Sequence, residues 1–394
     1  MNVLLTLGRL AKGLELARSL HRAGHRVIIA DPFRWHLSKP SRAIAKSYQV
    51  TAPNSDLEQY LHNLLEIIER DAIDLVVPVS EEALYASRLA SRLPTRTGLY
   101  GPAFETMAHL HDKLAFAQKC KALGFAAPET YAAHTEAARD LAARSDYVIK
   151  PMHGCSGLGV ALRSRGQPLS DQDAQPDKLV QRRLHGRQIS SFSVARKGKV
   201  QVTALYEGDV YLGTVSVRFK RVQTLPSVER WIAEFISAEA YDGFISFDFF
   251  VDDQGTPSAI ECNPRLTSGV HLIDRDDLAA AVTGSDIQAF RFKPNKTFQD
   301  AHAALTVAVG AITRPLTYFK LLGKILTTKD VVFDWRDPLP FFLMTPMSWD
   351  TIRPGLFEGV PLADAVTRDI LWQGPNPTIS GQEEVSYYGA EPGY

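Results

Sequence analysis

The chain of 394 residues is long enough for two or three domains with a substantial hydrophobic core. Its 44 Lys and Arg residues balance 44 Asp and Glu residues, so no net charge draws it to nucleic acid or to a membrane surface. The longest apolar stretch, near residues 303–312, is far too short to span a bilayer, and three widely spaced cysteines exclude a disulfide framework or a zinc cluster. The N-terminus has no signal-peptide pattern, and we expect a cytoplasmic enzyme.

Residues 1–103 alternate predicted strands with predicted helices. The strands cover residues 3–7, 27–30 and 75–79, and the helices cover residues 10–23 and 57–70. This alternation predicts a parallel sheet covered on both faces. Ligands of such sheets lie at the carboxyl ends of the strands, which here are Gly8-Arg9, Asp31 and Ser80-Glu81-Glu82.

The first strand and its loop raise the question of a dinucleotide site. Gly8 follows the strand, and Asp31 ends the second strand, where a ribose-binding acid would lie. The loop from Gly8 to Gly13 nevertheless lacks the G-x-G-x-x-G spacing that lets the backbone approach a pyrophosphate. A domain that positions a substrate is therefore the better interpretation than an NAD-binding domain.

Residues 104–290 follow a mixed α+β pattern. A predicted strand, 146–151, contains Lys150 and is followed by a glycine-rich loop, 153–160. Such a loop can lay backbone amides over phosphates while a lysine supplies a point charge, although the loop alone fits a plain surface turn equally well. The other predicted elements are helices at 113–123 and 227–240 and strands at 178–181, 189–196, 199–206 and 210–217.

A predicted hairpin carries the strongest chemical signal. Asp248 is surrounded by large apolar residues, Glu261 and Asn263 alternate with apolar residues, and residues 252–255 read as a turn. Pairing about that turn places Asp248 beside Glu261. Two carboxylates and an amide oxygen suit Mg²⁺, and Arg265 beside them suits a migrating phosphoryl group. The alternative, a hairpin whose acids face water, fits the apolar surroundings of Asp248 less well.

The order of lysine, glycine loop and acidic hairpin resembles the ATP-grasp superfamily, whose members join a carboxylate to an amine or another nucleophile through an acyl phosphate. The resemblance covers roughly residues 1–290, and residues 261–265 match the E-x-N-P-R signature of that family. It implies an α/β fold. An N-terminal parallel-sheet preATP-grasp domain (1–103) precedes a two-lobed ATP-grasp domain (104–290, hinge near 180–184) and a C-terminal extension (291–394).

The resemblance also implies roles for individual residues. Asp248, Glu261 and Asn263 would hold Mg²⁺, or Mn²⁺ in its place, against the phosphates of ATP. Arg265 would stabilise charge on the transferred phosphoryl group. The nucleotide would be bound by Lys113, Lys150, Gly154, Ser156, Gly157, Gly159, Gln181, Arg182, Leu184 and Gln188.

Two of these positions depart from the family pattern. The adenine edge would meet the Arg182 carbonyl and the Leu184 amide, but Gln181 and Gln188 stand where similar proteins usually have glutamate. Gln188 can still bond ribose hydroxyls, although without charge assistance. A plain surface role for Gln188 is equally compatible with the sequence.

Other side chains carry weaker predictions. Arg218, at the end of a strand, could bind the substrate carboxylate or the γ-phosphate, and a solvated arginine is an equal alternative. Arg9 could reach an anionic substrate. Cys155 and Cys262 are interpreted as packing residues. The aromatic and proline-rich tail is interpreted as an extension packed on the body rather than as a substrate lid.

The expected function is that of an ADP-forming carboxylate–amine ligase that acts on small molecules and uses ATP and Mg²⁺. An ATP-dependent carboxylase or phosphotransferase of the same fold and a non-catalytic nucleotide-binding protein are the alternatives. No nucleic-acid or membrane partner is expected, and a homodimer would be unsurprising in this family.

Overall fold

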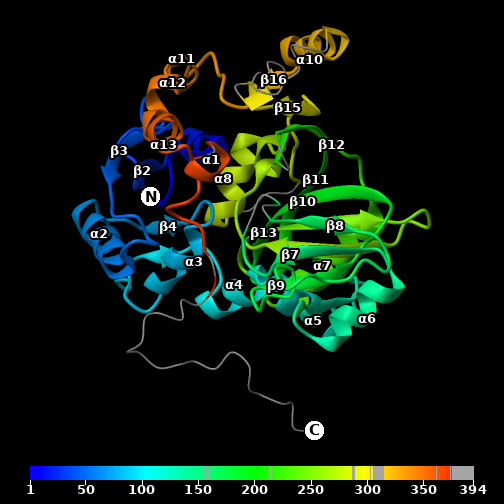
Figure 1. Cartoon of the computed structure of the whole chain (residues 1–394). Coiled ribbons are helices and arrows are strands. Elements are labelled where there is room, and N and C mark those ends of the chain that lie inside the picture. The colour runs from blue at the N-terminus through cyan, green and yellow to red at the C-terminus, as the bar shows by residue number, and fades with distance from the viewer. Residues whose placement is uncertain are drawn as a thin grey trace.

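Three β-sheets organise the computed structural model, which describes residues 1–154, 157, 159–212, 215–285, 289–301, 303–304, 315–360, 362–372 and 374. Figure 1 shows the first sheet and its helices on one side of the molecule and the other two sheets on the other side. The fold is α/β, as expected, and no helix within the described residues is long and apolar enough to cross a membrane.

The first sheet is parallel, as its alternating strands and helices predicted. Its strand order is β3-β2-β1-β4-β5. Strand β3 (Ile44–Gln49) was not predicted, because this strand is half exposed and its sequence is largely polar. The other elements are β1 (Asn2–Leu5), α1 (Ala11–Arg22), β2 (Arg26–Asp31), α2 (Leu57–Arg70), β4 (Leu75–Val77), α3 (Ala83–Ala86), η1 (Ser87–Leu89) and β5 (Gly98–Leu99).

The second sheet is a small antiparallel one with strand order β6-β9-β7-β8. Helix α5 (Lys113–Ala122) leads into it and begins at Asp112, whose side chain accepts hydrogen bonds from two backbone amides of the first turn. The remaining elements are α4 (Phe104–His111), β6 (Thr130–Ala132), α6 (Glu136–Arg144), β7 (Tyr147–Pro151), β8 (Ala161–Arg163) and β9 (Lys178–Arg182).

The third sheet has strand order β14-β13-β10-β11-β12-β15-β16. Helix α7 (Pro226–Ala238) packs Trp231 against Phe247 and Phe249 of β13 (Gly243–Val251). Because side chains alternate along a strand, this packing turns Asp248 to the opposite face. The other elements are β10 (Arg187–Arg196), β11 (Lys199–Leu212), β12 (Val215–Arg221), β14 (Pro257–Asn263), η2 (Ser268–Leu272), α8 (Arg275–Thr283), β15 (Thr297–Gln299) and β16 (Lys329–Asp330).

One predicted boundary in this sheet was wrong. Residues 199–206 and 210–217 were expected to be separate strands, but β11 continues through Gly208 to Leu212. The register between β11 and β12 shifts twice near Gly208 and Val210. The Glu-Gly-Asp segment therefore forms bulges within one strand instead of a turn between two.

The chain after residue 290 adds β15 and β16 to the third sheet and then returns to the first domain. Figure 1 shows α11 to α13 beside α1, β2 and β3. Buried ion pairs join Arg18 to Asp337 and Arg9 to Asp369, and the Trp372 ring packs edge-on against Tyr85. The extension thus packs on the body. Its helices are α10 (Pro315–Thr327), α11 (Leu339–Phe342), α12 (Met344–Met347), α13 (Trp349–Glu358) and α14 (Leu362–Ala365).

Candidate active site

The hairpin of β13 and β14 places two carboxylates opposite each other. Asp248 pairs with Glu261, and a bulge follows immediately after Asp248. Asn263 pairs with Ser246, two residues before Asp248, so all three predicted metal ligands lie on one face of the sheet. The pairing that the sequence predicted is present in the structure.

Asp248 is unfavourably placed as an isolated anion. Its Oδ1 accepts a hydrogen bond of 2.6 Å from Ser190 Oγ on the neighbouring strand β10. Burial, and next the Glu261 carboxylate, raise the pKa of Asp248 to about 6. Asp248 and Glu261 are half-buried, and two adjacent carboxylates that repel each other are stabilised when a cation binds between them.

The donor set is small. In the part of the chain that the structure describes, no three His, Cys, Asp or Glu side chains gather around a common metal position. Asn263 completes the set, but its Nδ2 lies 3.4 Å from Asp248 Oδ2 while its Oδ1 accepts from Arg265 at 3.0 Å. The amide of Asn263 would have to turn for its oxygen to face a cation held by Asp248.

Two lysines approach this face, Lys113 from the start of α5 and Lys150 from β7 of the second sheet. Lys113 Nζ lies 4.0 Å from Glu261 Oε1 and donates to the Gly154 carbonyl at 2.8 Å. Lys150 is buried and donates to Gln181 Oε1 at 2.8 Å. Burial lowers the pKa of Lys150 to about 8, although the Glu261 carboxylate acts in the opposite direction. Glu261 is therefore the ion-pair partner of Lys113 and the acid that acts most strongly on the pKa of Lys150.

Arg265 is held by a residue of the first domain. Its Nη2 lies 2.6 Å from Oε1 of Glu81, which is fully buried beyond the end of β4. Burial alone would raise the pKa of Glu81, but Arg265, and then His111, hold that pKa below its ordinary value. The sequence placed Glu81 at a strand end that faces ligands, but nothing in it indicated the contact with Arg265.

Glu82, the residue after Glu81, has a structural role. Glu82 Oε1 accepts hydrogen bonds from the backbone amides of Val79 and Ser80 and from Thr6 Oγ1. These bonds fix the loop after β4 to β1. Glu82 is also the N-cap residue of α3, although its side chain makes no capping hydrogen bond.

The glycine-rich loop follows β7 directly. Gly154, Gly157 and Gly159 all have positive φ angles, of 110°, 64° and 72°. A Cβ at Gly159 would also come within 2.9 Å of Pro151 Cγ, so the loop needs glycine for its backbone path and for its close approach to β7. Ser156 lies outside the described residues.

The predicted adenine hinge lies at the end of β9. The Arg182 amide donates to the Glu129 carbonyl, and within the described residues the Leu184 amide donates to no partner. Gln181 bridges Lys150 and Thr130 through its amide. Gln188 is exposed on β10, in register with Phe250, and shares the sheet face of Asp248.

Other singled-out residues are engaged elsewhere. Arg218 lies within β12, where it pairs with Asp209 and donates to Thr328 Oγ1 at 2.9 Å, and the structure does not bring it into contact with the acidic pair. Arg9 is buried between Asp31 and Asp369. Burial raises the pKa of the Cys262 thiol, which accords with a packing role. Cys155 lies outside the described residues.

The sequence was compared with protein-family models and with curated proteins. A family model described as the ATP-grasp domain matches residues 110–269. No curated protein matches the sequence.

Several solved structures have a similar fold. The biotin carboxylase domain of Hydrogenobacter thermophilus 2-oxoglutarate carboxylase, a dimer in complex with MgADP, ADP and bicarbonate, has a TM-score of 0.60 at 13% identity, covering 75% of this chain and 73% of that one. N5-carboxyaminoimidazole synthetase from Staphylococcus aureus has a TM-score of 0.61 at 14% identity (80% and 86% covered). L-amino acid ligase from Bacillus licheniformis has a TM-score of 0.57 at 16% identity (75% and 78% covered). The TM-scores show a shared fold, and at these low identities the likeness shows the fold alone.

Proposed function

Because the chain contains an ATP-grasp domain, we propose that it is an ADP-forming ligase that joins a small-molecule carboxylate to an amine through an acyl phosphate. The observation that carries the proposal is the Asp248–Glu261 pair, which faces Lys113, Lys150 and Arg265. Carboxylates for a divalent cation and cations for phosphate oxygens are the groups that phosphoryl transfer needs. The similar folds of an amino acid ligase and of an MgADP-bound carboxylase domain support this choice.

The residues present fit Mg²⁺ and a nucleotide. Burial and the Glu261 carboxylate raise the pKa of Asp248 more than Lys150 and Arg265 lower it, so a bound cation would stabilise this carboxylate. Glu261 and a turned Asn263 amide complete an all-oxygen donor set. When bound, Mg²⁺ would offset the negative charge of the phosphates. The metal ligands in this proposal are Asp248, Glu261 and Asn263.

The remaining side chains would bind and orient the nucleotide. Lys113 and Lys150 would contact phosphate oxygens, and the backbone amides of the loop that includes Gly154 and Gly159 would cover them. The Leu184 amide and the Arg182 carbonyl would meet the adenine edge. Gln188, on the same sheet face as Asp248, is placed for a ribose hydroxyl.

The reaction requires no nucleophilic side chain. An oxygen of the substrate carboxylate attacks the γ-phosphorus, the bond to the bridging oxygen of ADP breaks, and an acyl phosphate forms. The amine then attacks the acyl carbon, and inorganic phosphate leaves with the former carboxylate oxygen. Arg265, fixed by Glu81, would stabilise the charge that develops on the phosphoryl oxygens.

The proposal is tested by phosphate release from MgATP with paired panels of acids and amines, followed by mass spectrometry of the product. Turnover should require both members of a pair. The variant Glu261→Gln should lose at least about a hundredfold in rate, the scale of a lost electrostatic contact to the transition state. The control Glu105→Gln, at an exposed position of α4, should be unaffected.

A carboxylase is the second candidate, because two of the similar structures are a biotin carboxylase domain and a carboxyaminoimidazole synthetase. Phosphate release with bicarbonate and without any other acid would favour this activity and contradict the ligase. Turnover unchanged by Glu261→Gln would contradict both enzymatic proposals.

A further inference from the structure

A cavity of about 560 Å³ lies away from the candidate active site, where α1, α8 and the chain after β16 meet. None of the residues predicted to bind nucleotide, metal or substrate lines it. Its volume is in the range of small-molecule sites. We call it the α1–α8 cavity.

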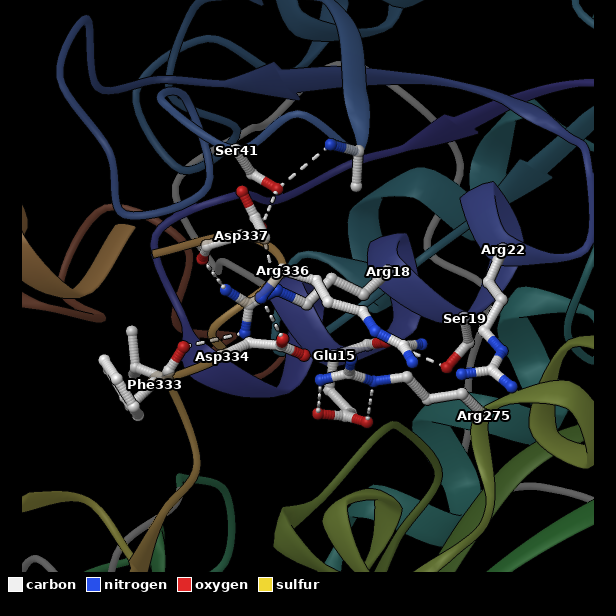
Figure 2. Close-up of polar contacts among 12 residues, drawn as sticks. Glu15, Arg18, Ser19, Arg22, Ser41, Arg275, Phe333, Asp334, Arg336 and Asp337 are labelled. Atoms are coloured by element: carbon white, nitrogen blue, oxygen red, sulfur yellow. Dashed lines mark hydrogen bonds and ion pairs between the residues drawn. The ribbon is translucent and has the colours of Figure 1, made fainter. Parts of the chain in front are cut away.

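A buried acid on α1 is neutralised within this cavity. Glu15 is fully buried and pairs with Arg275, whose Nε lies 2.8 Å from Oε1, and with Lys293. Burial alone would raise the pKa of Glu15, but Lys293 and Arg275 hold it well below its ordinary value. Figure 2 shows the Arg275 guanidinium directed at the Glu15 carboxylate. This carboxylate is therefore fully compensated by the protein itself.

The other carboxylates of the cavity are also engaged. Asp334 pairs with Arg275 and accepts from the Arg336 backbone amide. Asp330 accepts hydrogen bonds from three backbone amides, and Asp274 is the N-cap of α8 and lies 3.6 Å from Arg291. None of these acids needs a ligand to satisfy it.

In contrast to these acids, some of the basic side chains that line the cavity have no partner within the described residues. Within the described residues, the side chains of Lys329 and Arg336 form no hydrogen bond or ion pair. Arg22 pairs only at the exposed edge, with Asp276. Figure 2 shows Arg22, Arg275 and Arg336 around the same region, from α1, α8 and the chain after β16. The opening therefore offers positive charge to an anion.

A pair of aromatic side chains, one exposed and one half-buried, borders the same opening. Trp335 is 82% exposed, and its ring centroid lies 4.7 Å from that of Phe333, which also lines the cavity. The exposed Trp335 ring lines the same cavity as Lys329 and Arg336, and an aromatic face of this kind can stack on a planar group.

We propose that the α1–α8 cavity binds a small oxyanion that carries a planar apolar group. Lys329 and Arg336 contact the carboxylate or phosphate, and Trp335 and Phe333 contact the planar group. The proposed site is separate from the proposed ligase reaction and does not depend on it, because a binding measurement tests it without any turnover.

The test is titration of the full chain, kept in saturating MgADP, with phenyl phosphate and with phenylacetate, read by calorimetry and by Trp335 fluorescence. Inorganic phosphate and benzyl alcohol serve as probes without the ring and without the charge. One of the two aromatic oxyanions should bind roughly tenfold more tightly than either control probe, a difference of about 1.4 kcal/mol. The tighter of the two tells whether the site prefers phosphate or carboxylate.

Variants locate the binding. Lys329→Gln/Arg336→Gln should weaken it at least about fivefold, and Trp335→Leu should remove the fluorescence change. The matched pair Lys121→Gln/Arg139→Gln, on exposed positions of α5 and α6, should leave it unchanged. Equal binding of all four probes, binding that survives the Lys329/Arg336 double variant, or binding abolished by MgADP would each overturn the proposal.

Discussion

Single side chains decide the electrostatics of the candidate site, and Lys150 is the clearest case. Its direct partner is the neutral amide of Gln181, at a position where a glutamate would have neutralised the charge of Lys150. Burial then lowers the pKa of Lys150 to about 8. Lys150 therefore loses its charge within a range of pH that experiments can reach.

The affinity for MgADP should therefore depend on pH. Because the pKa of Lys150 is lowered below the ordinary 10.5, the side chain is charged below about pH 8 and neutral above it. Calorimetric titration should show affinity falling by up to about tenfold between pH 7 and pH 9. In Gln181→Glu the added carboxylate should move this fall to higher pH, whereas Gln59→Glu on exposed α2 should not. An unchanged midpoint in Gln181→Glu would contradict the assignment of Lys150.

Asp248 should reduce the stability of the apoprotein at neutral pH. Its pKa is raised from 3.8 to about 6, so its protonated form stabilises the folded state below about pH 4, and this contribution is lost as the pH rises through 6. We expect Asp248→Asn to unfold at the same or a higher temperature than the parent protein at pH 7.5.

The same variant should lose the increase in melting temperature that Mg²⁺ with a non-hydrolysable ATP analogue gives the parent protein. Asp253→Asn in the exposed hairpin turn is the matched control and should keep it. An Asp248→Asn protein that is still stabilised by the metal nucleotide would show that Asp248 is not a ligand.

The elements of the fold join side chains that are far apart in the sequence. The loop after β4 carries Glu81 to Arg265 beyond β14, and this ion pair links the first sheet to the third. We interpret Glu81 as a positioning residue, since it acts through the Arg265 guanidinium.

Glu81→Gln should therefore lower kcat by roughly 10- to 100-fold with little change in the KM for ATP, because Arg265 loses its charged partner while nucleotide binding is kept. Steady-state phosphate release separates the two parameters, and Glu81→Asp should recover part of the rate. A variant with raised KM and unchanged kcat would instead place Glu81 in substrate or nucleotide binding.

Local patterns predicted the hairpin, because alternation around Asp248 and the turn at residues 252–255 are properties of neighbouring residues. The long strand β11 was missed, since a bulge and a turn favour the same Gly-Asp residues. The contact between Glu81 and Arg265 was missed for a different reason. It depends on how two sheets pack, and no periodicity in either segment reports that packing.

At the scale of the whole molecule, the chain after residue 290 packs on the first sheet and its helices. Arg9, which the sequence offered as a substrate contact, is buried between Asp31 and Asp369 of the extension. The Trp372 ring packs edge-on against Tyr85 and Phe104, in a hydrophobic cluster that also contains residues of β1, β2, α2 and β4. We expect the two parts to unfold together.

The two tryptophans of the extension should differ sharply. Trp372→Ala should lower the free energy of unfolding by about 3–5 kcal/mol, because Trp372 is only 7% exposed. Trp335→Ala should change it by less than about 0.5 kcal/mol, since Trp335 is 82% exposed. Denaturant unfolding measures both. Equal effects of the two substitutions would contradict the packing of the extension on the first domain.

The central claim, carboxylate activation as an acyl phosphate, is tested most directly by oxygen transfer. The acid of an active acid–amine pair is labelled with ¹⁸O in its carboxylate, and the released phosphate is analysed by mass spectrometry. We predict that each C–N bond formed yields ADP and a phosphate that carries a single ¹⁸O atom. Unlabelled phosphate, or label found in AMP, would contradict the account.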